Sequence, residues 1–236
     1  MCLSYRYFSP LKTLIVWIIT AFLVSACSPR SNQQNKTMDT PSQILAQQLE
    51  FLGYHKLFLA GSQEKAPEVW QKGANKALLL EVINSPSSTP YSKFLAAEIF
   101  HYSNEALPEA THKPLARAYA YTLAHTSTRK KNSLPLNGNA WGLLYEEDDP
   151  GQVGKHFMSL GKATIPSLVE LLEDSDGEVL YEGSEEALLG SGYQYRIKDF
   201  AAFYLSKITG IPITFYQNIK KRDAEIERFK RAIGKK

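Results

Sequence analysis

The chain has 236 residues, enough for one sizeable domain or a short array of repeats, and a formal net charge of only +3. Its composition, 44% hydrophobic and 22% charged, is ordinary for a globular protein. The basic residues are dispersed except at the C-terminus, so we expect no groove for nucleic acid.

The N-terminus has the three parts of a secretory signal peptide. Arg6 and Lys12 supply positive charge, residues 14–24 form an apolar run, and small residues follow. The apolar run is well short of the roughly 20 residues that a membrane-crossing helix needs. We therefore expect residues 1–26 to be a signal peptide that is removed on export.

The end of this segment, VSAC at residues 24–27, resembles the lipobox of bacterial lipoproteins: an aliphatic residue, two small residues and a cysteine. The resemblance implies cleavage before Cys27 and acylation of its thiol and new amino group, which anchors the protein to a membrane. An ordinary secreted protein with a cysteine here by chance is the alternative. Cleavage would also remove Cys2, which excludes a disulfide within the mature chain. In lipoproteins of this kind, a serine such as Ser28 after the cysteine implies export to the outer membrane, facing the periplasm, if the source is Gram-negative.

Residues 27–40 are predicted to be the lipidated cysteine and a flexible tether, because residues 28–40 are polar and lack an apolar period. Beyond the tether, apolar residues recur at helical spacing, and the pairs Thr40-Pro41 and Thr89-Pro90 are typical helix starts. We expect N-terminal helical pairs over residues 41–126, with helical segments at 41–59, 67–83, 91–102 and 114–125. Gly73 could break the second of them.

A long connection at residues 127–160 interrupts the helical pattern. It contains a basic run at 129–131, a glycine-rich turn at 137–142 and acidic residues at 146–149. A break of this length indicates either a boundary between two sub-arrays or an ordered loop with a function. Trp141, which lies in the turn, is either an exposed ring on a binding loop or a buried anchor. The large apolar area of tryptophan favours the anchor.

Residues 161–236 contain a second helical hairpin. Apolar residues at helical spacing predict helices over 165–172 and 197–208, with an insert at 177–195 between them and Gly210 as a left-handed stop. A last amphipathic helix has Ile226 and Phe229 on its apolar stripe among basic residues, and it is expected to cap the array.

The two halves contain an internal repeat of helix pairs. Residues 93–100 align with residues 198–205, and each copy has a lysine, two residues and then an alanine pair. With the preceding IPSLVELLED at 165–174, the second copy resembles a HEAT-type repeat. Ile197 and Lys198 stand where that family has Val-Arg. The resemblance implies an array of helix pairs and, loosely, a binding role.

The insert holds the strongest candidates for catalysis and binding. Glu185 and Glu186 are paired carboxylates, which can divide the acid and base roles of glycoside cleavage, and the nearby rings of Tyr193 and Tyr195 suit sugar stacking. Together with Arg196 and the tryptophan of the long connection, these tyrosines are the candidate binding residues. The favoured interpretation of the two glutamates is structural, because acids in the first turn of a helix stabilise its dipole.

Metal and cofactor sites are not expected. Glu98 and His101 have the i, i+3 spacing of a di-iron ligand pair, but a di-iron site needs a second such motif, so we interpret them as a pair on a helix surface. The other histidines, His156 among them, show no metal-binding spacing. The acidic stretch at 174–178 does not complete a calcium-binding loop.

We therefore predict an all-α fold, a HEAT-like and α-solenoid-like array of helix pairs after a signal peptide and tether. The expected function is that of a membrane-anchored envelope lipoprotein, acting as a protein-binding or scaffold module through its helices and the 177–195 loop. The expected partners are the membrane, through the lipid, and a protein. The alternatives are an envelope glycan hydrolase using the carboxylates of the 181–196 loop, and a carrier with an apolar cavity for lipid or a small ligand.

Overall fold

The computed structural model describes residues 39–144 and 148–234, and every regular element within these ranges is a helix. The all-α fold class is confirmed: an antiparallel bridge between Leu143 and Asp149 is isolated, and the described ranges contain no strand. The predicted signal peptide, Cys27 and nearly all of the predicted tether lie outside the described residues. No helix in the described ranges combines the length and apolar character needed to cross a membrane.

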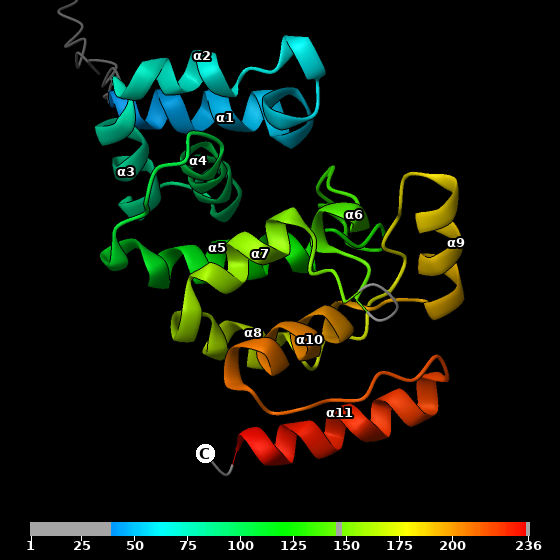
Figure 1. Ribbon diagram of the computed structural model, residues 1–236. Coiled ribbons are helices and arrows are strands. Elements are labelled where there is room, and N and C mark those ends of the chain that lie inside the picture. The colour runs from blue at the N-terminus through cyan, green and yellow to red at the C-terminus, as the bar shows by residue number, and fades with distance from the viewer. Residues whose placement is uncertain (1–38, 145–147, 235–236) are drawn as a thin grey trace, which may run out of the picture. The chain divides into compact units, whose positions relative to one another are not determined.

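Figure 1 shows the helices in successive layers, from α1 and α2 through α3 and α4, then α5 and α7, then α8 and α10, to α11. Their bounds are α1 (Pro41–Phe58), α2 (Ala66–Trp70), α3 (Lys76–Asn84), α4 (Pro90–Tyr102), α5 (His112–Ala124), α6 (Gly138–Trp141), α7 (Gln152–Ser159), α8 (Ile165–Leu171), α9 (Ser184–Tyr193), α10 (Ile197–Thr209) and α11 (Ile219–Ile233). A 3₁₀ turn precedes α5 and another precedes α8. The layers follow the order of the chain.

The N-terminal half is built around α4. Helix α1 begins at a reciprocal cap, in which the Thr40 hydroxyl accepts from the Gln43 N–H and the Gln43 side chain accepts from the Thr40 N–H. The segment predicted at 67–83 is two helices, α2 and α3, with a 3₁₀ turn that ends at Gly73 between them. Both α1 and α3 pack on α4, and nine of the thirteen residues of α4 are buried.

Helix α10 is the central, most buried helix of the C-terminal half, as α4 is of the N-terminal half. It packs on α8, eight of its thirteen residues are buried, and Gly210 ends it in the left-handed region as predicted, with φ 69°. The alanine pairs of the two repeat copies, Ala96–Ala97 and Ala201–Ala202, are all 0% exposed. Helix α5 contacts both α4 and α8, so it joins the two halves into one core.

A chain of aromatic rings runs through this core. Phe94 on α4 meets the ring of Tyr119 on α5 edge-on, with centroids 5.0 Å apart, and Tyr119 stacks on Phe157 of α7 at 5.4 Å. Phe157 in turn meets Tyr204 of α10 edge-on at 6.1 Å. All four residues are fully buried. Because such pairs contribute about 0.5–1.5 kcal/mol each beyond area burial, they help to hold α4, α5, α7 and α10 together.

Helices α6 and α7 lie in the connection for which the sequence analysis predicted no helix. Trp141 at the end of α6 is fully buried, its indole N–H donates to the Thr126 hydroxyl at 2.9 Å, and its carbonyl accepts from Tyr204. It is therefore the anchor of the connection and not an exposed binding ring. Gly142 follows with φ 105°, and an added Cβ there would lie 2.2 Å from the Asp149 carbonyl, so only glycine fits.

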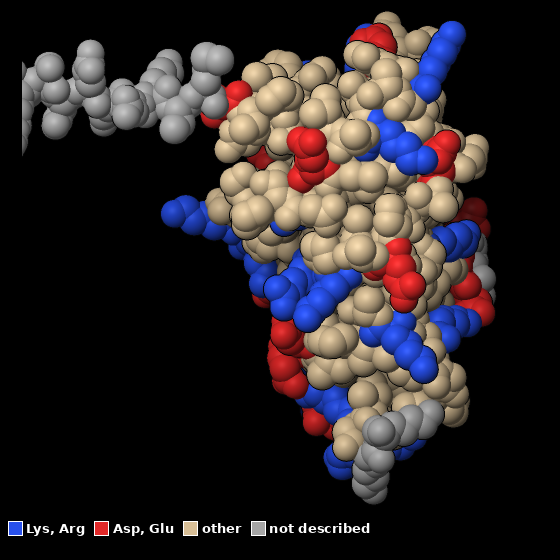
Figure 2. All heavy atoms as spheres, turned by 90° about the vertical axis from the view of Figure 1, so that its left-hand side faces the viewer, with Lys and Arg blue, Asp and Glu red and all other residues tan. Residues whose placement is uncertain are grey.

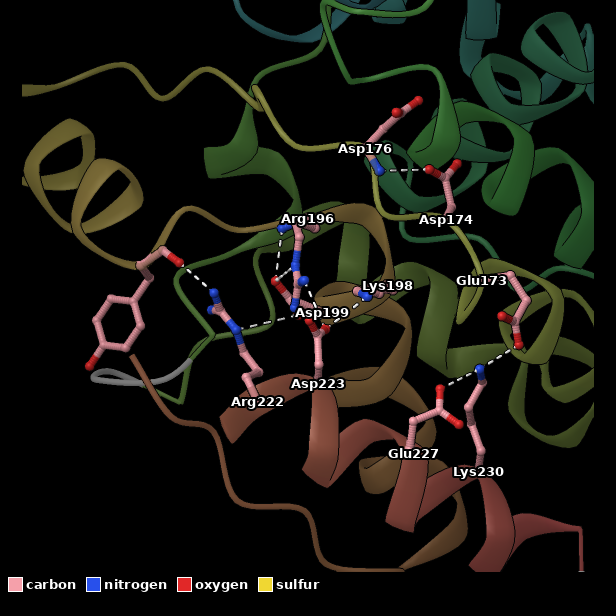
Figure 3. A network of polar contacts seen from close by, with 11 residues as sticks. Glu173, Asp174, Asp176, Arg196, Lys198, Asp199, Arg222, Asp223, Glu227 and Lys230 are labelled. Carbon is pink, nitrogen blue, oxygen red and sulfur yellow. Dashed lines mark hydrogen bonds and ion pairs between the residues drawn. The ribbon is translucent and has the colours of Figure 1, made fainter. Parts of the chain in front are cut away.

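A buried ionic network fixes α11 to α10 (Figure 3). Asp199 is 0% exposed and accepts three hydrogen bonds from Arg196, of 2.9, 3.0 and 3.1 Å. Arg222 of α11 is also fully buried, with its Nε 3.6 Å from Asp199 and its Nη2 donating to the Tyr193 carbonyl at 2.6 Å. Asp223 pairs with Arg196 at 2.8 Å. The predicted apolar stripe of α11 is present, but the sequence did not reveal that this helix buries a basic side chain.

The face in Figure 2 carries acidic and basic side chains side by side. Ion pairs of this kind also occur on α11, where Lys230 pairs with Glu173 at 2.5 Å and with Glu227 at 2.8 Å. Exposed pairs of this kind contribute at most about 1 kcal/mol each. They neutralise part of the basic charge of α11 locally.

We expect Asp199→Asn to lower the free energy of unfolding by about 3 kcal/mol, because the neutral amide removes the counter-charge of two buried guanidinium groups. Urea denaturation followed by circular dichroism measures this value. The matched control is Glu227→Gln, which removes an exposed carboxylate of the same α11 surface and should cost less than about 1 kcal/mol. Equal losses in the two variants would contradict the role given to the buried network.

Candidate functional site

The two loops that the sequence analysis singled out lie against each other. Residues 127–142, from the long connection, run beside residues 177–182, from the insert, and we call the two segments the joined loops. The Gly138 N–H donates to the Leu180 carbonyl at 2.6 Å. The loops therefore form one structural unit, although about 40 residues of chain separate the paired positions.

Side chains reinforce this unit at both of its ends. The Asn139 amide exchanges two hydrogen bonds of 2.8 Å with the backbone of Glu182, one donated and one accepted. At the other end, the Ser127 hydroxyl donates to the Gly177 carbonyl at 2.6 Å. The backbone of the insert is thus bound by polar side chains of the long connection.

Charged residues of the joined loops and the adjoining turn neutralise each other. Arg129 pairs with Glu178 at 2.8 Å, and Lys130 lies 2.7 Å from Asp176 and 3.1 Å from Asp174. The basic run and the acidic stretch, which the sequence shows separately, are therefore partners. The acidic residues at 174–178 are therefore explained as ion-pair partners of Lys130 and Arg129.

The ring of Tyr181 fills the space between α6 and α9. A Cβ added at Gly138 would lie 2.4 Å from this ring, and one added at Gly190 would lie 2.3 Å from it. The Tyr181 hydroxyl donates to the Gly142 carbonyl at 3.3 Å. Both glycines therefore permit a close approach that any larger residue would prevent.

A cleft of about 450 Å³ opens where α1, α4, α7 and the joined loops meet. Its apolar wall includes Leu59 and Tyr102, whose exposed fractions are 52% and 42%. Its polar lining includes two histidines, two carboxylates and three amides, namely His101, His156, Glu98, Glu182, Asn137, Asn139 and Gln152. We call this cavity the histidine cleft.

Glu98 is the central group of the histidine cleft and is 3% exposed. It accepts a hydrogen bond from the Tyr119 hydroxyl, and His156 Nδ1 lies 3.0 Å from each of its carboxylate oxygens. Burial, followed by the charge of Glu98, raises the pKa of Tyr119 well above its usual value, so the hydroxyl remains a donor. The other ring nitrogen of His156 accepts from the Gln152 amide at 3.0 Å.

The ring of His101 stacks on that of His156, with centroids 3.8 Å apart and an angle of 8° between the planes. Burial, and then the charge that His156 can carry, lowers the pKa of His101 from 6.5 to about 4. The imidazole of His101 is therefore neutral at pH 7. Its Nε2 is buried and has no hydrogen-bond partner among the described residues.

The interpretation of Glu98 and His101 as a surface pair is wrong. The carboxylate is buried, and a third group, His156 on α7, completes the cluster. The i, i+3 spacing on α4 was a correct signal for two neighbouring ligand-type side chains. The sequence contained no signal for His156, because it lies 58 residues away on a helix that was not predicted.

The predicted site residues of the insert do not join the histidine cleft. Tyr195 and Arg196, which are 3% and 8% exposed, line a separate cavity of about 720 Å³, and Tyr193 stacks on Tyr195 with centroids 5.4 Å apart. Glu185 and Glu186 occupy the first turn of α9, as the structural interpretation predicted. Neither glutamate lines this cavity or the histidine cleft.

A further cavity of about 600 Å³ adjoins the histidine cleft along the joined loops. The two share Tyr54, Leu59, Asn137 and Glu182 in their walls. A ligand bound in the histidine cleft can therefore extend over the joined loops. The volume available to a ligand is therefore larger than the 450 Å³ of the cleft alone.

We expect Gly138→Ala to lower the free energy of unfolding by about 1–3 kcal/mol, because the added methyl group would overlap the Tyr181 ring. The matched control is Gly192→Ala in α9, where a Cβ would have no neighbour closer than 3.8 Å. That change should be neutral or stabilise the protein by up to about 1 kcal/mol through helix propensity. Thermal denaturation of both variants measures the difference, and similar midpoints would contradict the packing of the joined loops.

No protein-family model, no curated protein and no solved structure matches this chain. The function is therefore inferred from the geometry of the histidine cleft and the joined loops. These features combine solvent-facing apolar side chains, a buried carboxylate with its partners, and a pair of hydrogen-bonded loops.

Proposed function

We propose that this chain is an envelope lipoprotein, anchored through Cys27, that binds a protein partner in the histidine cleft and on the joined loops. The tether holds the helical body away from the membrane, which is the outer membrane facing the periplasm if the source is Gram-negative. The observation that carries the proposal is the cleft, where apolar side chains face solvent between three helices and two loops.

A HEAT-like, α-solenoid-like arrangement is part of the proposal. Each repeat copy is a packed helix pair, α3 on α4 and α8 on α10, and the alanine pair of each copy is buried. Helix α5 lies against both pairs. In arrays of this kind, stacking buries a continuous core while the exposed faces of the helices and loops bind other proteins.

The chemistry of the cleft rim favours a protein partner. Leu59, Tyr102 and Leu180 are 52%, 42% and 64% exposed, which is unusual for large apolar side chains that lie close together on a cleft and its neighbouring loop. Aromatic side chains with a polar rim are typical of protein interfaces. Phe58 and Tyr102 form an aromatic pair with ring centroids 6.1 Å apart, and a leucine or phenylalanine of the partner would pack on this pair.

Protein binding is favoured over glycan hydrolysis by Glu185 and Glu186. Glycoside cleavage needs two carboxylates that face each other across the scissile bond. Consecutive residues of a helix point in different directions, so two adjacent glutamates on α9 do not face each other. Their position in the first turn has a structural explanation, since acids there stabilise the helix dipole.

Photo-crosslinking in cells tests the proposed binding surface. With a photo-reactive phenylalanine analogue at Tyr102 of the full lipoprotein, we expect one dominant protein adduct, identified by mass spectrometry. The matched control is Tyr216, which is 39% exposed in the segment before α11 and does not line the cleft. Adding Leu59→Asp should reduce the adduct by about tenfold, the effect of losing one interface anchor.

Either of two results would count against a protein partner. The Tyr102 and Tyr216 probes could give the same adducts, which would indicate non-specific contact. Alternatively, the Tyr102 probe could give only glycan adducts, which would favour the hydrolase instead. A purified adduct partner should then bind the detergent-purified lipoprotein directly, and the Leu59→Asp variant should bind it more weakly.

The anchor is tested separately. Metabolic labelling with a fatty acid should label the chain, and Cys27→Ser should abolish the label and release the protein from the membrane fraction, because the acyl chains supply the membrane affinity. Cys2→Ser is the matched control and should leave both unchanged. Labelling that persists in Cys27→Ser would show that the lipobox resemblance is misleading.

A further inference from the structure

We infer that Glu98, His101 and His156 form a binding site for a divalent transition-metal ion such as Zn²⁺. One donor atom from each of the three side chains lies within 4.8 Å of the other two. Two histidines and one carboxylate are a known donor set for catalytic zinc and for non-haem iron. The inference depends on these side chains alone and is independent of the proposed protein partner.

Two helices place the three donors. Helix α4 supplies Glu98 and His101 at i, i+3, which puts both on one face, and α7 supplies His156 opposite them. His156 Nδ1 lies 3.0 Å from both Glu98 oxygens. This separation is close to the edge of about 3.3 Å for a tetrahedron of ligands about 2.0–2.1 Å from zinc. Two of the three ligands are therefore spaced for an ion. Its binding requires the His156 proton to move from Nδ1 to Nε2, where the Gln152 amide, turned over, would accept it through its oxygen.

His101 is the ligand that must move. The lone pair of an imidazole nitrogen lies in the ring plane, and the rings of His101 and His156 are stacked 8° from parallel, so both cannot point at an ion between them. Rotation of the His101 side chain directs its Nε2 toward Glu98. That nitrogen is buried without a hydrogen-bond partner among the residues that the structure describes, so the rotation breaks no described hydrogen bond of Nε2. Binding an ion would satisfy this buried polar atom.

The surroundings have the two features expected of a metal site. Outside the three ligands, the Tyr119 hydroxyl donates to Glu98 and fixes the orientation of the carboxylate, as outer-shell partners of metal ligands do. On the other side, all three ligands line the histidine cleft. Three protein ligands leave a fourth coordination position, which would face the cleft and could take water or a group from a bound molecule.

Metal titration of the full chain tests the inference. The chain carries Cys2→Ser and Cys27→Ser, so that no thiolate competes, and is purified in detergent and titrated with Zn²⁺ against a chromophoric chelator. We expect one equivalent of Zn²⁺ to bind. His101→Gln and His156→Gln should each weaken binding by about 100-fold or more. The matched control is His125→Gln, which changes another half-buried histidine and should leave the affinity unchanged.

Thermal denaturation separates loss of the site from loss of the fold. Zn²⁺ should raise the Tm of the parent chain and leave that of His101→Gln unchanged, because only the metal-binding form is stabilised by the ion. If His156→Gln does not fold, His101→Gln decides the question, since its metal-free helical spectrum should match that of the parent. Failure of the parent chain to bind Zn²⁺ would overturn the inference. Equal affinity in the parent and His101→Gln would also overturn it.

Discussion

The buried carboxylate of Glu98 is the constraint on which this structure depends. A charge that is 3% exposed is costly to bury unless hydrogen bonds and a counter-group compensate it. Tyr119 on α5 and His156 on α7 provide them, so one side chain of α4 holds three helices in a single arrangement. Because His156 pairs with Glu98, its ring also lies beside that of His101, which is one helical turn after Glu98 on α4. This buried carboxylate therefore also forms part of the polar floor of the histidine cleft.

The wall of the cleft is held in place by hydrogen bonds and packing. The long connection is held by Trp141, whose indole and carbonyl are bonded to Thr126 and Tyr204 inside the core. The insert is held to that connection by backbone hydrogen bonds and by the packing of Tyr181 against Gly138. Both loops are therefore folded against the core, and a partner of the kind proposed would bind with a smaller loss of conformational entropy.

The two proposals concern different parts of the same cleft. Protein binding would use the apolar rim, where Leu59 and Tyr102 face solvent, and metal binding would use the donors on its floor. They are physically compatible, because an ion held by three side chains keeps one coordination position toward the cleft. A carboxylate or imidazole of the bound partner would complete that coordination. The ion would then add specificity to an interface whose affinity comes mainly from apolar burial.

Much of the local structure was determined by the sequence. The start of α1, the end of α10 at Gly210 and the helical face of α4 were predicted, because caps, turn glycines and apolar periodicity act within one or two turns of a helix. The i, i+3 pair Glu98 and His101 was visible for the same reason. The lipobox resemblance at Cys27 also belongs to the sequence, and the structure does not describe those residues.

Only the tertiary structure decided which of these local features meet. His156 lies 58 residues from Glu98, and side-chain pairs of the joined loops lie 43 to 50 residues apart, so no short-range pattern connects them. The burial of Arg222 likewise depends on Asp199, which belongs to a different helix. A basic residue on an amphipathic helix normally faces water, and a histidine without a spaced partner normally binds no metal. Packing of whole helices reverses the first expectation, because it places a compensating charge where the neighbouring sequence has none. Under the proposed metal site it would reverse the second expectation in the same way, by supplying the other ligands.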